Sequence, residues 1–145
     1  MPTCARWPGK IKPGSRSDQR IVTMDIFPTV CEAASATFDH PIDGVSFYSI
    51  LTGEQPTLAP RDLFFHRREG GTRYGGLIIN AVIRDDWKLL QNSPFAGQEL
   101  YNLKTDPAES ENLIGKNKSK FQELSTALRA QVQRGGALPW QKPSD

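Results

Sequence analysis

The sequence predicts a chain of mixed class, an α/β fragment followed by a small α+β subdomain. Residues 63–134 show three or four short strand patterns and then one amphipathic helix, which together predict a sheet covered by a helix. Residues 1–62 show a strand-like edge, one helix and long loops, and a lone strand and helix cannot cover each other. Only 37% of the 145 residues are hydrophobic. The first part is therefore expected to belong to a larger sheet.

The first part opens with a loop and leads into a helix predicted over residues 25–36. Pro8-Gly9 and Pro13-Gly14 predict two turns in the loop. Asp25 is the expected N-cap of the helix, and Pro28 falls in the first turn, where a missing amide hydrogen costs little. Apolar side chains then recur at helical spacing on one face. They are Ile26, Phe27, Val30, Cys31 and Ala34.

Residues 37–62 are expected to be irregular apart from one short helical piece. Asp43-Gly44 is a turn signal, and residues 45–53 predict a helical piece that ends on Gly53. The stretch that follows, up to residue 62, is typical of a surface linker.

The second part predicts an antiparallel sheet of three or four strands. Short apolar runs occur four times, and Asp85-Asp86 predicts a tight turn that joins the middle two runs into a hairpin. A basic, glycine-rich loop is expected over residues 67–76. The predicted strands cover residues 63–66, 77–84, 87–91 and 99–103.

An amphipathic helix is predicted over residues 119–134. Asn117 or Ser119 can cap it, and Gly135-Gly136 is expected to end it. Residues 135–145 form a tail that is expected to be loosely held. The apolar positions of the helix fall on one face. They are Phe121, Leu124, Leu128 and Val132.

Composition argues against several classes of partner. The net charge of +2 does not indicate nucleic-acid binding, and no apolar run is long enough for a membrane span. The N-terminal residues lack the apolar region of a signal peptide, so the chain as written is expected to stay in the cytoplasm. Cys4 and Cys31 either pair or stay free, and two buried thiols is the preferred interpretation.

The residues alone predict no catalytic centre. His40 and His66 have no partner pattern for metal binding or nucleophilic catalysis, and no phosphate-binding glycine loop is present. Arg67, Arg68 and Arg73 with His66 can form an anion-binding rim, because guanidinium groups suit sulfate and phosphate. A solvated loop is the favoured interpretation of the same residues.

Acidic and aromatic residues are also interpreted structurally. Turn chemistry explains Asp85, Asp86 and Asp106 better than metal binding does, so no metal site is predicted. Large aromatic side chains in the second part are expected to lie in the core. They are Trp87, Tyr101 and Phe121.

Six short segments occur in an order that is typical of one enzyme family. They are "WPG", "DIFPT", "DGVS" with "LTG", "DLFFH", "AVIRDDWKLL" and "ELYNLKTDPAESENL", followed by the amphipathic helix. This order resembles the C-terminal portion of sulfatases of the arylsulfatase and N-acetylgalactosamine-6-sulfatase type, in the alkaline-phosphatase-like superfamily. The resemblance covers residues 2 to about 134.

The resemblance implies a fold and a function for a complete parent protein. Residues 1–62 would be the end of the large sulfatase α/β domain, residues 63–134 its small C-terminal subdomain, and residues 135–145 a tail. The parent would hydrolyse sulfate esters with a formylglycine nucleophile and calcium. Such parents are often periplasmic or secreted.

The segments that carry the chemistry of the family are absent from this chain. Neither Cys4 nor Cys31 lies in the C-x-P-x-R pattern that is converted to formylglycine. No catalytic, metal or cofactor residue is therefore assigned, and the chain alone is expected to be inactive. The initial Met1-Pro2 corresponds to a valine-proline in the family, which suggests a gene interrupted or misassigned at an internal GTG codon.

The resemblance implies substrate contacts at His66, Arg67 and Arg68, whose partner would be a sulfated small molecule or carbohydrate. Two alternatives remain open. In the first, the chain is a stand-alone, non-catalytic binding module that uses its sheet and basic loop. In the second, it is the tail of a related phosphate-ester hydrolase, since a fold does not fix the chemistry of its site.

Overall fold

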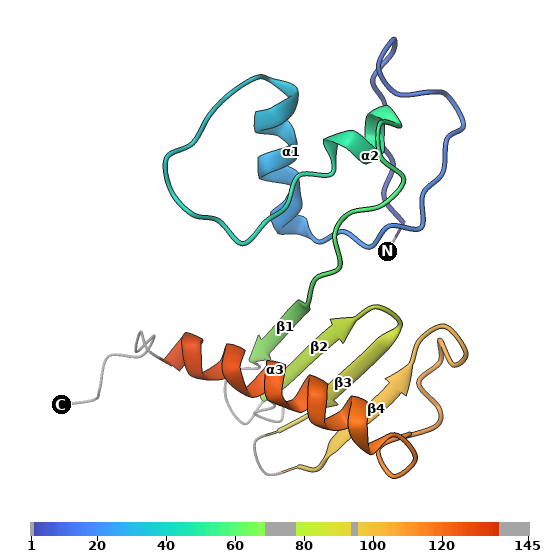
Figure 1. The fold of residues 1–145 in the computed structure, drawn as a ribbon, viewed down its shortest axis with the longest axis vertical. Coiled ribbons are helices and arrows are strands. Elements are labelled where there is room, and N and C mark those ends of the chain that lie inside the picture. Colours follow the sequence, from blue (N-terminus) through green and yellow to red (C-terminus); the bar gives the residue numbers. More distant parts are fainter. Residues whose placement is uncertain (1, 69–77, 94–95, 137–145) are drawn as a thin grey trace, which may run out of the picture. The chain divides into compact units, whose positions relative to one another are not determined.

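A computed structural model describes residues 2–68, 78–93 and 96–136 (Figure 1). The chain divides into two compact units, residues 1–59 and 60–145. The first unit consists of loops and short helices, and the second is a sheet with one long helix. An α/β fragment followed by a small α+β subdomain was the predicted fold class.

The first unit contains a 3₁₀ turn, η1 (Thr23–Asp25), and two helices, α1 (Ile26–Ala33) and α2 (Tyr48–Thr52). Both predicted loop turns are present, because the carbonyl of Trp7 accepts from the amide of Lys10 (3.0 Å) and that of Lys12 from Ser15 (3.2 Å). Among the described residues of this unit no strand is found. The expected strand-like edge would pair within a larger sheet, so it stays a prediction. Val22 has extended backbone angles, φ −123° and ψ 162°, but extended backbone becomes a strand only where a partner strand supplies a ladder.

Helix α1 is shorter than predicted and ends without a glycine. Ser35 adopts a left-handed φ of 54°, and the amide of Ala36 donates to the carbonyl of Cys31 (2.8 Å). This is the Schellman arrangement, which normally uses glycine at the left-handed position. Serine carries no such signal, so the sequence placed the helix end near residue 36. Helix α2 ends at Gly53, as predicted.

Asp25 occupies the predicted N-cap position of α1, but its side chain is fully buried and makes no capping hydrogen bond to the helix. Its carboxylate accepts hydrogen bonds from the amides of Val22 (2.8 Å) and Val45 (2.9 Å). The Thr29 hydroxyl donates to the Asp25 carbonyl (2.6 Å) and accepts from the amide of Phe47 (3.0 Å). These four bonds form the Asp25–Thr29 network, which holds residues 45–47 against the polar side of α1.

Gly44 is required by this close approach rather than by a turn. A Cβ atom at position 44 would lie 2.1 Å from the carbonyl oxygen of Met24. Pro28 has no amide hydrogen to give that carbonyl, so no helical bond draws it back toward α1. The "DIFPT" and "DGVS" segments are therefore the two halves of one contact.

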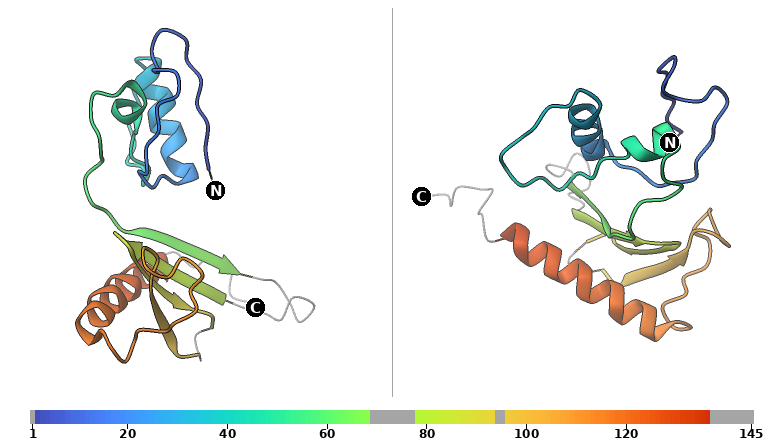
Figure 2. Two further views of the ribbon diagram at one scale, coloured as in Figure 1. Left: turned by 90° about the vertical axis from the view of Figure 1, so that its right-hand side faces the viewer. Right: turned by 45° about the horizontal axis from the view of Figure 1, so that its top comes forward.

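The second unit is a meander of four antiparallel strands in the order β1-β2-β3-β4 (Figures 1 and 2). The long helix α3 (Lys118–Gly136) lies along one face of the sheet. The predicted tight turn at Asp85-Asp86 joins β2 to β3, with Asp85 at a φ of 52°. The strands are β1 (Leu63–Arg68), β2 (Ile78–Arg84), β3 (Trp87–Gln91) and β4 (Gln98–Asn102).

Strand bounds differ from prediction at two places. β1 continues through Arg67 and Arg68, which pair with Ile79 and Ile78, so these arginines belong to a strand rather than to the predicted loop. β4 lies one residue earlier than predicted. The glycine-rich remainder of the predicted loop lies outside the described residues.

One in-register row of apolar side chains forms the core. Phe64, Val82, Leu89 and Leu100 lie opposite one another across the four strands, and α3 adds Leu124 and Leu128. Fully burying each such side chain contributes about 1.5–3 kcal/mol. Of the three aromatic residues expected in the core, Trp87 and Phe121 pack against this row. Tyr101 is also buried, but it follows Leu100 in β4 and therefore faces the other side of the sheet.

Val132 does not join this core, although it continues the apolar face of α3. Its side chain is exposed. A helix of 19 residues is about 28 Å long, whereas the outer strands of a four-stranded sheet lie about 14 Å apart. The last turns of α3 therefore extend beyond the sheet.

Polar contacts attach α3 to the same face. Arg84 donates to both carboxylate oxygens of Asp62 (2.5 and 2.6 Å) and to Glu123 on α3 (2.7 Å). These bonds, first those to Asp62 and then that to Glu123, raise the pKa of Arg84 above its usual value. Ser125 donates to Gln98 on β4 (3.0 Å).

Replacing the buried carboxylate tests the role of the Asp25–Thr29 network. Asp25→Ala leaves the amides of Val22 and Val45 without this acceptor, which we expect to destabilise the first unit by about 1–3 kcal/mol for each donor left unsatisfied. Hydrogen exchange at these amides is the measurement, and both should exchange faster. The matched control is Asp43→Ala, which changes an exposed carboxylate next to the same contact. Unchanged protection at Val45 would show that the network is dispensable.

Candidate functional site

The residues predicted to contact substrate lie at the end of β1. His66 pairs with Asn80, and Arg67 with Ile79. Because successive side chains of a strand point to opposite faces, His66 and Arg67 face opposite sides of the sheet. Both are exposed, and Arg73 lies outside the described residues. The three predicted contacts are consecutive in one strand, but His66 and Arg67 do not share one face of it. A substrate role for His66, Arg67 and Arg68 stays a prediction.

The side chain of His66 is oriented by a neighbour. Its Nδ1 lies 2.8 Å from the Oδ1 of Asn80, on the sheet face that carries α3. An amide oxygen only accepts, so the hydrogen of the neutral ring lies on Nδ1 and Nε2 is left as an acceptor. The ring can accept a hydrogen bond from a substrate hydroxyl, or donate to an anion once it is protonated.

The "ELYNLKTDPAESENL" segment forms a turn that returns the chain to the edge of β4. Asn112 Oδ1 accepts from the amides of Leu100 and Ile114 (both 3.1 Å), and the amide of Leu113 donates to the carbonyl of Leu100 (2.7 Å). The open edge of the sheet is thereby partly satisfied before α3 begins. These residues serve the fold.

Asp106 organises the first half of that turn. Its carboxylate accepts from the amides of Ser110 (2.8 Å) and Glu111 (2.9 Å) and from the Ser110 hydroxyl (2.9 Å). The bond from Glu111 and then those from Ser110 lower the pKa of Asp106, because they stabilise the charged form.

Glu109 holds the second half of the turn to the sheet. Lys88 on β3 donates to both of its carboxylate oxygens (2.7 and 2.6 Å). Glu109 takes a left-handed φ of 54°, which is uncommon for a residue with a side chain of this size. Nearby, the bond from Tyr101 to Glu99 (2.8 Å), with burial as the second cause, raises the pKa of Tyr101 to about 12.

Other candidate residues do not come together. Among the described residues no group of three or more histidine, cysteine, aspartate or glutamate side chains is placed to hold a metal ion. Both cysteines are free thiols: Cys31 is half-buried, but Cys4 is exposed, which corrects the expectation of two buried thiols. His40 lies in a loop beside Asp39. No helix in the described parts of the chain is long and apolar enough to cross a membrane.

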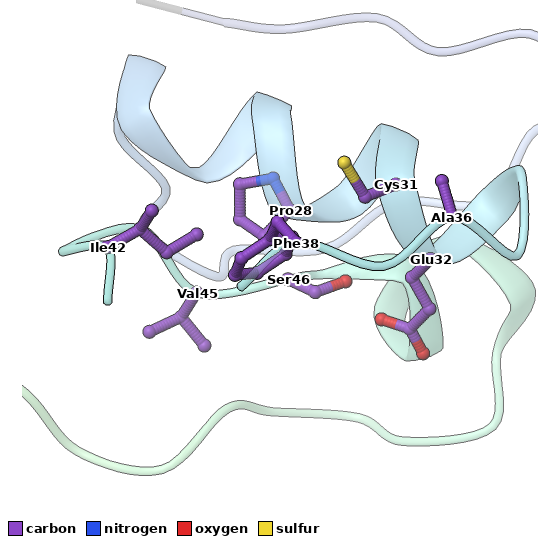
Figure 3. A pocket seen from close by; sticks show the side chains of 9 residues that line it. Pro28, Cys31, Glu32, Ala36, Phe38, Ile42, Val45 and Ser46 are labelled. Carbon is purple, nitrogen blue, oxygen red and sulfur yellow. The ribbon is translucent and has the colours of Figure 1, made fainter. Parts of the chain in front are cut away.

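An open hollow of about 480 Å³ lies beside α1, between the helix and the loop that follows it (Figure 3). Its lining is mostly apolar. The polar side-chain groups in the lining are the thiol of Cys31, the carboxylate of Glu32 and the hydroxyl of Ser46. Sequence reasoning missed this hollow, because its residues come from separate short segments. They are Pro28, Cys31, Glu32, Ala36, Phe38, Ile42, Gly44, Val45 and Ser46.

Comparison with known proteins places the fold among the sulfatases. The solved structure of BT4656, in complex with its substrate D-glucosamine-2-N,6-O-disulfate, superposes with a TM-score of 0.77 at 25% identity, covering 96% of this chain and 29% of that one. An ulvan-active sulfatase from Formosa agariphila is 32% identical over 78% of this chain and 28% of its own length. An N-acetylglucosamine-6-O-sulfatase from Bacteroides thetaiotaomicron is 29% identical over 80% of this chain and 21% of its own length.

These matches define a C-terminal sulfatase portion of the alkaline-phosphatase-like fold, as the order of segments implied. The chain belongs to the family described as N-sulphoglucosamine sulphohydrolase, C-terminal, which matches residues 1–136. It spans less than a third of the length of the relatives given above.

The lowered pKa of Asp106 predicts an acid-sensitive turn. A carboxylate with a lowered pKa in the folded state adds stability above its unfolded pKa and loses it as pH falls through the folded pKa. We expect Asp106→Asn to lower the thermal midpoint of the sheet unit at pH 7, and the gap from the unchanged chain to close as the pH falls below 3.8, the ordinary value.

Thermal unfolding followed by circular dichroism between pH 7 and pH 2 measures this gap. Asp39→Asn, which changes an exposed loop carboxylate in the other unit, serves as the control and should show no such dependence. A gap that stays constant across the whole pH range would contradict the prediction.

Proposed function

We propose that the protein to which this chain belongs hydrolyses sulfate esters of sugars. The observation that carries the proposal is the match to a sulfatase family over residues 1–136. The substrate class is supported by BT4656, whose substrate is a sulfated glucosamine, and by relatives named for ulvan and for N-acetylglucosamine 6-O-sulfate.

Formylglycine and calcium are the nucleophile and the cation that we expect in the complete protein. The described residues of this chain contain no set of side chains that fits calcium, and no C-x-P-x-R pattern is present in the sequence. We therefore assign the catalytic step to residues that this chain does not contain, and expect no sulfate release from the chain alone.

The contribution proposed for this chain is positional. The end of β1 presents an oriented histidine on one face and a cation, Arg67, on the other, directly before residues 69–77. A sulfated polymer carries repeated negative charge, so Arg67 and Arg68 would attract it without taking part in bond breaking. His66 would contact a neighbouring hydroxyl or sulfate group.

An assay of sulfate release from D-glucosamine-2-N,6-O-disulfate tests the proposed activity. The DNA upstream of the Met1 codon is sequenced and translated in frame, and any longer protein is compared with the 145-residue chain. We expect the longer protein to contain C-x-P-x-R and to release sulfate, and the 145-residue chain to release none.

A phosphate monoester is assayed in parallel. Hydrolysis of that ester alone would replace the proposal with a phosphate-ester hydrolase. An in-frame stop codon upstream, together with binding of a sulfated polysaccharide by the 145-residue chain, would replace it with a stand-alone binding module.

Kinetics of the complete protein test the role of the β1 residues. We expect the double variant Arg67→Ala, Arg68→Ala to raise KM for a sulfated polymer several-fold while kcat changes little, because uniform binding is lost. Lys104→Ala, an exposed cation at the far end of the sheet, is the control and should leave both constants unchanged. Equal losses in kcat and kcat/KM would instead assign the arginines to the transition state.

A further inference from the structure

The loop that opens the first unit concentrates positive charge. Residues 1–20 hold five of the 18 lysine and arginine residues of the chain but only one of its 16 acidic residues, Asp18. The remaining residues carry a small net negative charge, so the overall value of +2 hides this contrast. Four of the five cations are exposed and pair with no carboxylate in the parts of the chain that the structure describes. They are Arg6, Lys10, Lys12 and Arg16, and residues 6–16 are the cationic arm.

Two turns of the same type place these cations. In residues 7–10 and 12–15 a proline is followed by a glycine with a left-handed φ, 81° at Gly9 and 72° at Gly14, as a type II turn requires. The amide of the fourth residue donates to the carbonyl of the first in each turn, at 3.0 Å and 3.2 Å. Such a turn brings its first and last residues within about 7 Å of each other. The cations at or next to the turn ends are Arg6 and Lys10 in the first turn and Lys12 and Arg16 in the second.

Both ends of the cationic arm are attached to the first unit. The ring of Trp7 packs edge-on against that of Tyr48 on α2, with centroids 6.2 Å apart. Beyond the second turn, the side-chain oxygen of Gln19 accepts from the amide of Leu58 (2.9 Å). The blue segment between these two points loops outward from α2 (Figure 1). The cations are thus placed before any ligand arrives, which lowers the entropy that binding costs.

An array of like charges on an ordered loop is suited to a linear polyanion. Neighbouring positive charges repel one another, and a bound anion relieves this repulsion. The four cations are two to four residues apart along an exposed loop, which fits charges repeated along a polymer better than one small anion. The guanidinium groups of Arg6 and Arg16 also present planar sets of donors that match the oxygens of sulfate.

The cationic arm favours a sulfated polysaccharide over a nucleic acid. Single-stranded nucleic acids are bound by aromatic rings on which the bases stack, and duplex DNA by a helix or a β-ribbon that enters a groove. The single aromatic ring of the arm, that of Trp7, is half-buried against Tyr48, and residues 6–16 contain no helix or strand. A polysaccharide that carries its sulfate groups on the outside needs neither device.

We propose that the cationic arm is a binding surface for the sulfated polysaccharide substrate. The inference rests on the proposed function, since it takes the sulfate esters of this polymer to be what the complete protein hydrolyses. It adds a contact on the first unit to those proposed at Arg67 and Arg68 on the second. Charges that hold the polymer raise the local concentration of its esters without taking part in bond breaking.

Binding of heparin, a sulfated glycosaminoglycan, to the 145-residue chain tests the proposal without measuring activity. The variants of the arm and of the control lose the same net charge, and the control changes exposed cations of the second unit. The arm variant carries Arg6→Gln, Lys10→Gln, Lys12→Gln and Arg16→Gln. The control variant carries Lys104→Gln, Lys118→Gln, Arg129→Gln and Arg134→Gln.

We expect the arm variant to bind heparin at least about tenfold more weakly than the unchanged chain at about 0.15 M salt, and the control variant to lose much less. Equal losses in the two variants would overturn the proposal, because net charge alone would then explain the binding. So would a DNA duplex that binds more tightly than heparin and that the arm variant no longer binds, because a nucleic acid would then be the ligand.

Single variants decide the matter if the arm variant does not fold. Lys10→Gln and Lys12→Gln should each lower the slope of log Kd against log salt by about 0.7, since each removes one contact that displaces a counterion. An unchanged slope in both would overturn the proposal.

Kinetics of the complete protein separate this inference from the proposed function. The arm variant should raise KM for heparin several-fold and leave sulfate release from D-glucosamine-2-N,6-O-disulfate unchanged, because one sugar is too small to reach several cations of the arm. An unchanged KM for heparin would overturn the proposal. Heparin binding that depends on the arm, in a complete protein that releases no sulfate, would count against the proposed function only.

Discussion

A carboxylate is buried only where hydrogen-bond donors replace the water that it loses. Asp25 meets this condition, because its carboxylate accepts from the amide of Val22, just before it in the chain, and from the amide of Val45, in the loop after α1. The rest of the first unit depends on these two hydrogen bonds, which replace the water around the carboxylate. Because Val45 is one of the donors, the loop after α1 must return to the helix, and only glycine fits at position 44 on the way. Once the polar side of α1 is used in this manner, its apolar side faces away from the unit.

The second unit buries aliphatic side chains in its interior and keeps its polar residues at the rim. Its core is a row of aliphatic side chains across four strands, closed by α3, and its polar residues satisfy the backbone at the rim. Asn112 and Asp106 accept backbone donors that a ladder or a helix leaves unpaired, and Glu109 accepts from the side chain of Lys88 on β3. The "ELYNLKTDPAESENL" segment is thus explained by its part in the fold rather than by catalysis. This is consistent with its presence in a chain that lacks the C-x-P-x-R pattern.

The sequence predicted the elements whose information is local. The β2–β3 hairpin, the strands beside it and α3 all follow from periodicity and turn residues within a few positions. It did not predict the burial of Asp25, because the donor at Val45 is 20 residues away. The left-handed residues Ser35 and Glu109 also escaped prediction, since neither type is typical of that conformation. The apolar face of α1 was found, but periodicity alone does not say whether the chain itself covers it. At the candidate site, the residue types left a solvated loop, the favoured interpretation, or an anion-binding rim, and neither interpretation included the strand alternation that separates His66 from Arg67.

The strand order of the sheet has a consequence for how this part of the chain folds. Every strand pairs with its neighbour in sequence, so each step closes only a short loop and loses little chain entropy. Proteins with such local contacts fold fast. The sealing residues Leu124 and Leu128 lie on the last element, however, so the apolar face of a nascent meander stays open to water until that helix has been synthesised. Ribosome pausing before residue 128 would therefore prolong the aggregation-prone stage of an otherwise rapid folder.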